Sequence, residues 1–215
     1  MRLTRQTELF SYTDKVVKTY LLLIVKEFNK LQRKVNVTGF DELNVINAVN
    51  SGWGEADRLM KDALQRIAIY YYHLGCKHCD IDPEDELFIL YFLAYLNDYD
   101  ELTHYQYNNE LDRKRARLIE AILSVNTLAK RKEQIQAALK LLTKQFKQTA
   151  DNVTEMALLR AFEEAGVEKI QWVTQRDERV CPVCNALDRK IFPIKKCPAL
   201  PQHYNCRCFV IPVDL

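Results

Sequence analysis

The sequence is poor in glycine and proline: its 215 residues include only five glycines and six prolines. Both counts fall below average usage, which is roughly 7% for glycine and roughly 5% for proline. This scarcity excludes collagen-like chains, flexible linkers and turn-rich β-sandwiches, and it favours long helices. The sequence also has no phosphate-binding loop, no dinucleotide-binding fingerprint and no Gly-x-Ser-x-Gly nucleophile motif.

Long apolar runs are missing as well. The two strongest, residues 20–25 and 87–96, are shorter than the roughly 18 residues that a membrane-spanning helix needs, so we interpret both as core helix segments. The N-terminus has no apolar signal region, and we therefore expect the thiols to meet a reducing cytoplasm. With 48% hydrophobic and 28% charged residues, the composition indicates a folded chain that can bury a core.

Apolar residues recur at helical spacing through most of the chain, which predicts a mainly α fold. The expected helices cover residues 14–31, 41–49, 55–74, 82–96, 110–146 with a bend near 124–127, and 151–166, followed by a β-prone segment at 169–174. We expect Asp41 and Asp82 to cap helix starts, and Gly75 and Gly166 to end helices. The segment 82–96 is apolar nearly all round, so we predict that it forms the most buried helix.

The helical pattern ends after Trp172, where five of the seven cysteines and most of the prolines gather. We therefore predict two domains, a helical domain at residues 1–150 and a small C-terminal α+β module at residues 151–215. A hydrophobic core is marginal at this size, so a stabilising metal is expected on thermodynamic grounds.

Charge is unevenly distributed although the net charge is only +2. Residues 38–104 contain 13 acidic and 4 basic residues, whereas residues 112–147 contain 3 acidic and 10 basic residues. Because the second region uses its apolar stripe for packing, we expect its basic face on the surface, with Lys130, Arg131 and Lys132 as candidate nucleic-acid-binding residues. The alternative is an internal charge match with the acidic region. The tyrosines and phenylalanines of residues 70–107 lie in that acidic region, so we interpret them as core and rim.

The strongest motif is a pair of chelating turns. Cys181-Pro-Val-Cys184 can direct two thiolates to one point, and His203-Tyr-Asn-Cys206 can add an imidazole and a third thiolate. These are the ligands of a closed tetrahedral zinc site, so we predict a structural zinc ion bound by this motif. Cys208 is the alternative fourth ligand, and we favour Cys206 because a two-residue gap is the recurring chelate spacing.

Other interpretations of the cysteines are a redox pair and a structural disulfide. A thioredoxin-like pair belongs at a helix start in a βαβ unit, which this region does not contain. We interpret Cys197 as a spare thiol, and Cys76 and Cys79, with His73 and His78 nearby, as thiols at a helix end without a distant ligand pair.

Two clusters of charged residues are better explained by local structure than by a binding or catalytic site. The acidic residues between Asp80 and Glu86 do not match a calcium-binding loop and are interpreted as a helix cap. The run from Arg176 to Arg179 is interpreted as a solvated edge with local ion pairs. We expect Arg207 to donate to nearby carbonyls or to Asp177.

Two segments carry a family resemblance: WVTQRDERVCPVCNALDRKIF at residues 172–192 and PQHYNCRC at residues 201–208. They resemble the C-terminal module of phage head morphogenesis proteins of the Mu F type, which are minor capsid proteins. The resemblance covers roughly residues 153–213, and Thr154-Glu155 matches a Thr-Glu pair of that family. Arg189 stands where the family commonly has glycine.

The resemblance implies a minor virion protein of a tailed phage or prophage. It would lie in the inner head or portal region after assembly in the host cytoplasm, and act in head assembly, portal association or DNA ejection. Its expected partners are the portal, other capsid proteins and packaged DNA, with no membrane and no small-molecule substrate. We expect no enzymatic activity, since a zinc ion with four protein ligands has no open position. The alternative is a zinc-stabilised nucleic-acid-binding regulatory protein.

Overall fold

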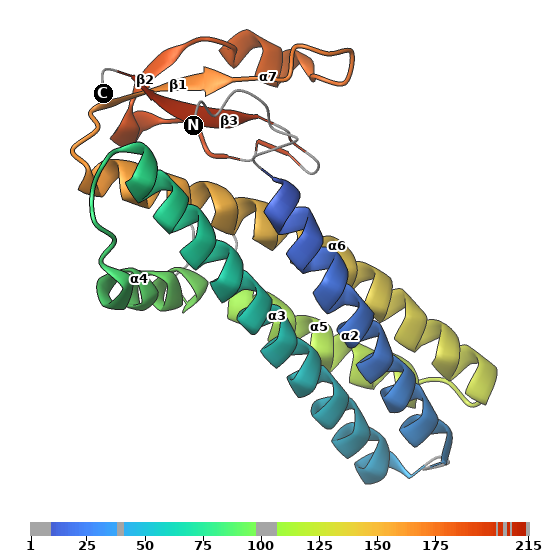
Figure 1. Cartoon of the computed structure of the whole chain (residues 1–215). Coiled ribbons are helices and arrows are strands. Elements are labelled where there is room, and N and C mark those ends of the chain that lie inside the picture. The colour runs from blue at the N-terminus through green and yellow to red at the C-terminus, as the bar shows by residue number, and fades with distance from the viewer. Residues whose placement is uncertain are drawn as a thin grey trace. The chain divides into compact units, whose positions relative to one another are not determined.

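The computed structural model describes residues 10–37, 41–97, 107–200, 202–203, 206 and 208–213. Its helices are α2 (Ser11–Val37), α3 (Glu42–His78), α4 (Asp85–Asn97), α5 (Tyr107–Leu123), α6 (Leu128–Glu164) and α7 (Pro182–Leu187), with a 3₁₀ turn η1 (Ile194–Lys196). Its strands are β1 (Lys169–Val173), β2 (Ile191–Pro193) and β3 (Phe209–Val213). The prediction of a mainly helical chain with a small C-terminal strand module is confirmed (Figure 1).

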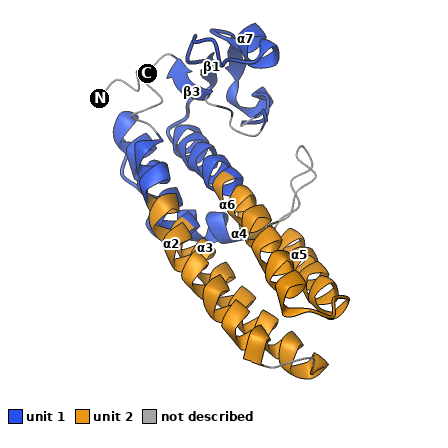
Figure 2. Ribbon diagram, turned by 90° about the vertical axis from the view of Figure 1, so that its right-hand side faces the viewer, with its two compact units in different colours: residues 1–15, 64–94, 148–215 blue, residues 16–63, 95–147 orange. Residues whose placement is uncertain are grey.

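The chain divides into two compact units (Figure 2). Unit 1 contains residues 1–15, 64–94 and 148–215, and unit 2 contains residues 16–63 and 95–147. The division passes through the helices α2, α3 and α6, so neither unit is one continuous segment. The domain boundary expected after residue 150 lies close to the point where α6 passes from unit 2 to unit 1, and it stays a prediction.

Helix α3 is one continuous helix of 37 residues, so the expected break between residues 49 and 55 is wrong. Asp41 caps its start as predicted, since its side-chain oxygen accepts the backbone N–H of Asn44 at 2.8 Å. Gly52 lies inside the helix, where a Cβ atom would come within 3.0 Å of Leu31 Cβ. This glycine therefore permits close helix packing within unit 2.

Gly75 has a similar role in unit 1, where it was expected to end the helix. Helix α3 instead continues to His78. A Cβ atom at Gly75 would lie only 2.6 Å from Ala161 Cβ on α6, so no larger residue fits without a shift of the helices. Glycine is expected both at the end of a helix and where two helices come into close contact. Only the packing shows which of these roles Gly75 has.

The predicted bend after α5 is confirmed, because α5 ends at Leu123 and α6 begins at Leu128. The expected separate helix from residue 151 is wrong, since α6 runs without interruption to Glu164. Gly166 ends it as predicted, with a φ of 73° in the left-handed region. The backbone N–H groups of Gly166 and Val167 then donate to the carbonyls of Glu163 and Phe162, each at 3.0 Å, which is a Schellman cap.

The most buried helix segment lies in α6 and not in α4. Six consecutive residues of α6, 153–158, are all buried, so the helix is covered on every side there. On α4, Phe88 and Phe92 are buried while Leu87 and Leu90 are 56% and 64% exposed. The prediction for α4 is wrong because an apolar composition on all faces does not tell which faces find a partner. The start of α4 also lies three residues beyond Asp82, at Asp85.

Buried hydroxyl groups link three helices of unit 1. The side-chain oxygens of Thr13 on α2 and Thr154 on α6 lie 2.8 Å apart. The backbone N–H of Thr13 donates to the hydroxyl of Tyr71 on α3, and Thr154 also donates to the carbonyl of Ala150 at 2.9 Å. Thr154, from the Thr-Glu pair, is therefore a buried contact between helices.

The C-terminal strands form an antiparallel sheet in the order β2-β1-β3. Trp172 on the central strand pairs with Val210 on β3, and both side chains are fully buried. A turn connects α7 to β2 through Arg189, which has a φ of 64° and donates its backbone N–H to the carbonyl of Trp172 at 2.8 Å. The turn thus forms although arginine replaces the glycine common in the family, at the cost of a left-handed backbone.

No helix in the described residues is long and apolar enough to cross a bilayer.

We predict that Arg189→Gly raises the free energy of unfolding of the C-terminal module by about 1 kcal/mol, because a left-handed conformation costs other residues roughly 1–2 kcal/mol more than glycine. The exposed contact of Arg189 with Asp188, at 3.8 Å, should contribute little against this gain. Urea unfolding followed by tryptophan fluorescence measures the difference. Arg189→Ala is the matched control, since it removes the same side chain but keeps the backbone cost. Equal stability of the two variants would contradict the prediction.

Candidate metal centre

The first chelating turn is built into the start of α7. Cys181 is the N-cap residue of this helix, and its Sγ accepts the backbone N–H of Cys184 at 3.3 Å. Pro182 occupies the first helical turn, where the missing N–H costs no hydrogen bond. The sequence Cys-Pro-x-Cys therefore folds locally into a tight helix start that holds both sulfur atoms on one side.

The second turn brings His203 and Cys206 to the same place. The backbone N–H of Cys206 donates to the carbonyl of His203 at 3.0 Å, which closes the His-x-x-Cys turn. His203 Nε2 lies 3.2 Å from Cys181 Sγ and 3.3 Å from Cys184 Sγ. The Sγ atoms of Cys184 and Cys206 are 3.7 Å apart. Residues 19 to 22 positions apart in the sequence are thus brought close together, with Cys184 next to both His203 and Cys206.

The ligand atoms form two overlapping groups, in each of which all atoms lie within 4.8 Å of one another. One group is Cys181, Cys184 and His203, the other is Cys184, Cys206 and Cys208, and Cys184 belongs to both. A tetrahedral site with metal–sulfur bonds of about 2.3 Å and metal–nitrogen bonds of about 2.0 Å has edges of roughly 3.5 to 3.8 Å. The observed separations are close to these edges, so the groups could hold a metal ion.

The thiols of these groups differ in burial and in hydrogen bonding, and therefore in pKa. Cys184, Cys206 and Cys208 are buried, whereas His203 is exposed. Hydrogen bonds from Cys208 lower the pKa of Cys206, and the same side-chain hydrogen bond raises the pKa of Cys208. Cys206 is therefore the more acidic thiol of this pair. Burial raises the pKa of Cys184 to about 12, so loss of its proton requires a nearby positive charge such as a metal ion.

The remaining cysteines stay outside these groups. Burial raises the pKa of Cys197 to about 12, with the charge of Glu155 adding to the shift. Burial likewise raises the pKa of Cys76 and of Cys79 at the end of α3. Within the described part of the chain, no metal-sized group includes any of these three thiols.

The charged run before Cys181 is tied to the module by Asp188. The carboxylate of Asp188 accepts the backbone N–H and the hydroxyl of Thr174, at 2.9 and 3.0 Å, and Arg176 Nε at 2.9 Å. Burial acts to raise the pKa of Asp188, but these hydrogen bonds outweigh it and the pKa is lowered. Asp177 accepts the backbone N–H of Arg179 at 3.1 Å. Local pairing thus accounts for Arg176 and Asp177, while Arg207 and the segment with His104 lie outside the described residues.

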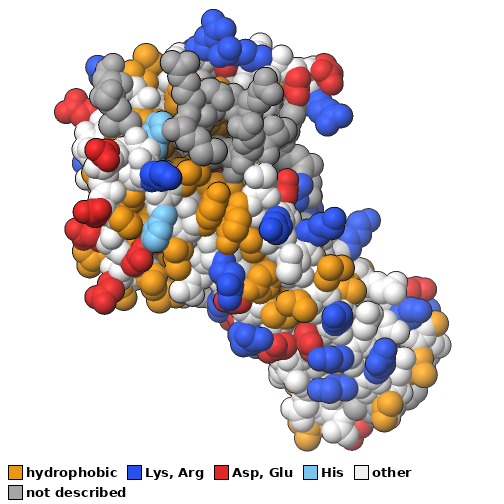
Figure 3. Space-filling model, in the orientation of Figure 1, with side chains coloured by type: hydrophobic (Ala, Val, Ile, Leu, Met, Phe, Trp, Pro, Cys, Tyr) orange, Lys and Arg blue, Asp and Glu red, His pale blue; other side chains and the backbone are white. Residues whose placement is uncertain are grey.

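The predicted basic surface needs one correction. Lys130 and Lys132 at the start of α6 are exposed, but Arg131 is only 2% exposed. Position 131 lies on the buried stripe of α6 that continues through Ile135, because residues four apart share a helix face. Arg131 is therefore not a surface residue for phosphate contact. Figure 3 shows other Lys and Arg side chains (blue) spread over the visible face of unit 2.

Glu155 is a residue to which sequence reasoning gave no role. It follows Thr154 on the fully buried part of α6 and is 2% exposed. Neither carboxylate oxygen has a hydrogen-bond partner among the described residues. Burial raises the pKa of Glu155 well above its ordinary value, and the charges of Cys206 and Asp151 add to this shift. The only sequence signal was the family's Thr-Glu pair, which marks the position but not its burial.

The fold and the Cys/His cluster together define a mainly helical protein whose small C-terminal strand module carries a candidate metal centre. A family model described as "Phage Mu protein F like protein" matches residues 104–211, and the chain belongs to this family. Family membership indicates a phage head morphogenesis protein. The match begins about fifty residues before the segment in which we found the resemblance, so it includes α5 and all of α6. No curated protein and no solved structure matches the chain.

We predict that Glu155→Gln stabilises the protein near neutral pH, because the amide does not ionise and so escapes the pH-dependent cost of keeping this buried carboxyl protonated. Burial raises the pKa of this carboxyl in the folded protein. Its contribution to the free energy of unfolding is therefore fully present below the pKa of the unfolded chain, and it is lost as the pH rises through the folded pKa. The gain of the variant over the parent should therefore grow from pH 4 to pH 8 in urea unfolding. Glu163→Gln, an exposed change on the same helix, is the control. A pH-independent difference between Glu155→Gln and the parent would contradict this account.

Proposed function

We propose that the protein is a minor capsid protein of a tailed phage or prophage, with a structural role in head assembly at or near the portal. The observation that carries this proposal is the family match over residues 104–211, which contains the whole Cys/His cluster. The expected absence of enzymatic activity is part of the proposal. A metal ion held by four protein ligands has no position left for a water nucleophile or a substrate oxygen.

The proposed metal is Zn²⁺, bound by Cys181, Cys184, His203 and Cys206. Three thiolates and one imidazole form a soft donor set that suits zinc, and the three separations described above between these atoms are close to tetrahedral edges. Cys206 joins the group of Cys181, Cys184 and His203 through its approach to Cys184. Cys206 is supported over Cys208 by its lowered pKa, while the Sγ atoms of both lie within 4.8 Å of that of Cys184. The ion would supply charge that stabilises the thiolates and would join the two turns. Structural zinc in small modules contributes on the order of 10 kcal/mol.

We predict that Cys184→Ser abolishes zinc binding and leaves the C-terminal module protease-sensitive while the helices persist, because Cys184 belongs to both ligand groups. Elemental analysis of protein purified under reducing conditions measures the zinc content, and limited proteolysis measures the fold. Cys197→Ser is the matched control, a change of another thiol of the same module outside both groups. Metal-free parent protein with a protease-resistant C-terminus would overturn the zinc proposal.

The fourth ligand is tested by a pair of variants. Cys206→Ser should lose zinc, whereas Cys208→Ser should retain it with lowered affinity, since Cys208 acts on the bound thiolate through a hydrogen bond. The reverse result would assign the fourth position to Cys208 and leave the structural role of the ion unchanged.

The function itself is tested in the particle. We predict that the protein is found in purified virions in few copies, that full-length protein pulls down the portal protein, and that deleting its gene lowers the yield of infectious particles. Quantitative mass spectrometry and plaque counts provide these measurements. Absence from the particles, together with unchanged infectivity of the deletion, would refute the proposed role.

The second candidate function is a zinc-stabilised nucleic-acid-binding regulatory protein, for which the exposed Lys130 and Lys132 provide the supporting observation. If these residues contact DNA, duplex binding should weaken steeply with salt, and the double variant Lys130→Ala, Lys132→Ala should reduce that slope by roughly 2. An unchanged slope in this variant would show that Lys130 and Lys132 do not contact DNA and that their charges serve internal pairing and solubility.

A further inference from the structure

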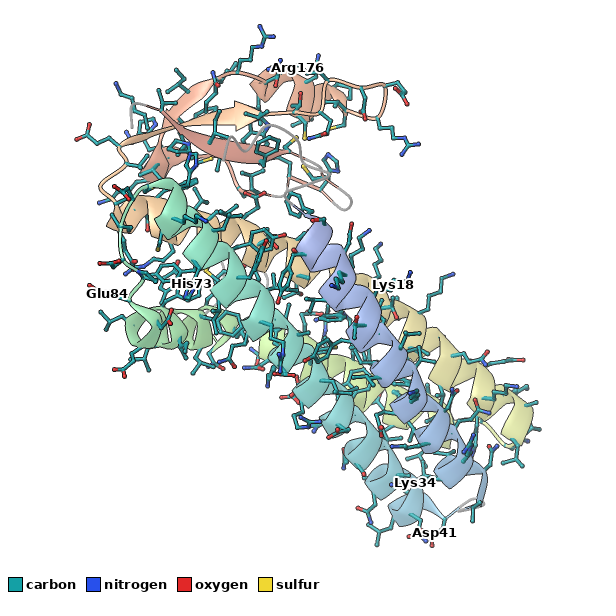
Figure 4. All side chains as sticks on the ribbon, viewed as in Figure 1. Lys18, Lys34, Asp41, His73, Glu84 and Arg176 are labelled. Carbon is teal, nitrogen blue, oxygen red and sulfur yellow. The ribbon has the colours of Figure 1, made fainter. Side chains whose placement is uncertain are left out.

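Unit 1 contains a groove of about 600 Å³ along the outer face of α3, next to the first turn of α2. The groove is lined by Tyr12, Arg66, Ile69, Tyr70, His73, Leu74 and Lys77. Six of these seven residues lie three or four positions apart on α3 and therefore share one helix face. His73 marks this face in Figure 4.

An aromatic platform forms the middle of the groove. The rings of Tyr12 and Tyr70 are stacked, with centroids 3.9 Å apart and an interplanar angle of 16°. Tyr71 meets Tyr70 edge-on at 5.0 Å, so the Tyr70 ring is held from two sides. Its side chain is nonetheless 44% exposed. A fixed, partly exposed ring of this kind can stack on another flat ring at a small entropic cost.

The charged groups that line the groove are basic. Arg66 and Lys77 are exposed and lie eleven residues apart, which corresponds to about 16 Å along the helix. His73 between them contacts the carboxylate of Asp85 at the start of α4, and the described residues that line the groove include no acidic side chain. The acidic character of residues 38–104 thus does not describe this surface. In Figure 3, the histidine side chains of unit 1 (pale blue) lie among apolar, basic and acidic ones.

We propose that this groove binds single-stranded nucleic acid. A base would stack on Tyr70, and phosphates of the nucleotides on either side of that base would lie near Arg66 and Lys77. Cationic grooves with aromatic platforms bind single strands in this way, since every base offers a flat face and every linkage a negative charge. A duplex fits poorly because its bases are stacked on one another, and an acidic peptide would leave the tyrosine platform unused.

Full-length protein is titrated into a fluorescently labelled oligodeoxythymidine, with a duplex of the same length as comparison, and binding is followed by anisotropy. The parent should bind the single strand more tightly than the duplex. Tyr70→Ala should weaken single-strand binding at least about fivefold through lost stacking, while Tyr70→Phe, which keeps the ring, should bind nearly as the parent does. Circular dichroism shows whether each variant is folded.

The phosphate contacts are tested by salt dependence. Arg66→Gln together with Lys77→Gln should reduce the slope of log affinity against log salt by about 1.4, since each lost contact with a single strand contributes about 0.7. The matched control is Lys18→Gln with Lys26→Gln, which removes two exposed charges of α2 outside the groove and should leave the slope unchanged. The Lys130→Ala, Lys132→Ala variant separates this groove from the duplex-binding surface considered above.

Three outcomes would overturn the proposal. The first is a parent without preference for the single strand at low salt, and the second is equal binding by Tyr70→Ala and Tyr70→Phe. The third is displacement of the oligonucleotide by polyglutamate at equal charge concentration, which would assign the groove to acidic polypeptides. Each result is independent of zinc content and of portal association, so the proposed function can stand or fall separately.

Discussion

The burial of α6 on all sides between residues 153 and 158 is the constraint on which the rest of unit 1 depends. A helix covered on every face needs neighbours that come close, and Gly75 of α3 provides that approach against Ala161. It also needs partners for its polar groups, which Thr13 provides for Thr154. Both carboxylate oxygens of Glu155 lack a hydrogen-bond partner among the described residues, so this side chain is a costly part of the packing.

The C-terminal module depends on local turns in place of a large core. Its three short strands bury Trp172 and Val210, and the short helix α7 and the turns around it are fixed by caps and hydrogen bonds. The Cys-x-x-Cys helix start and the His-x-x-Cys turn are both closed by backbone hydrogen bonds of their own. Within each turn the candidate ligands are thus positioned by short-range geometry, so that few residues are needed to hold them on a small scaffold.

The fold, and not the net charge of a sequence segment, decides on which surface each charged side chain of this protein lies. Residues 38–104 are acidic as a whole, yet the described lining of the groove on α3 includes Arg66 and Lys77 and no carboxylate. The segment 112–147 is basic as a whole, yet Arg131 is buried and Arg113 pairs with Glu110 within α5. A helix turns its side chains through all directions, so neighbours in sequence reach different surfaces and a segment count averages over them.

The sequence by itself determined the helical class, the small strand module and the two chelating turns, because helical periodicity and ligand spacing are properties of neighbouring residues. It also placed the cap at Asp41 and the helix end at Gly166, which depend on local backbone geometry. Only the tertiary structure decided that Gly52 and Gly75 are packing positions, that α6 and not α4 is fully buried, and that Tyr12 stacks on Tyr70. These features depend on which distant surfaces meet, and the gain from burying a surface can outweigh the local preference of a single glycine.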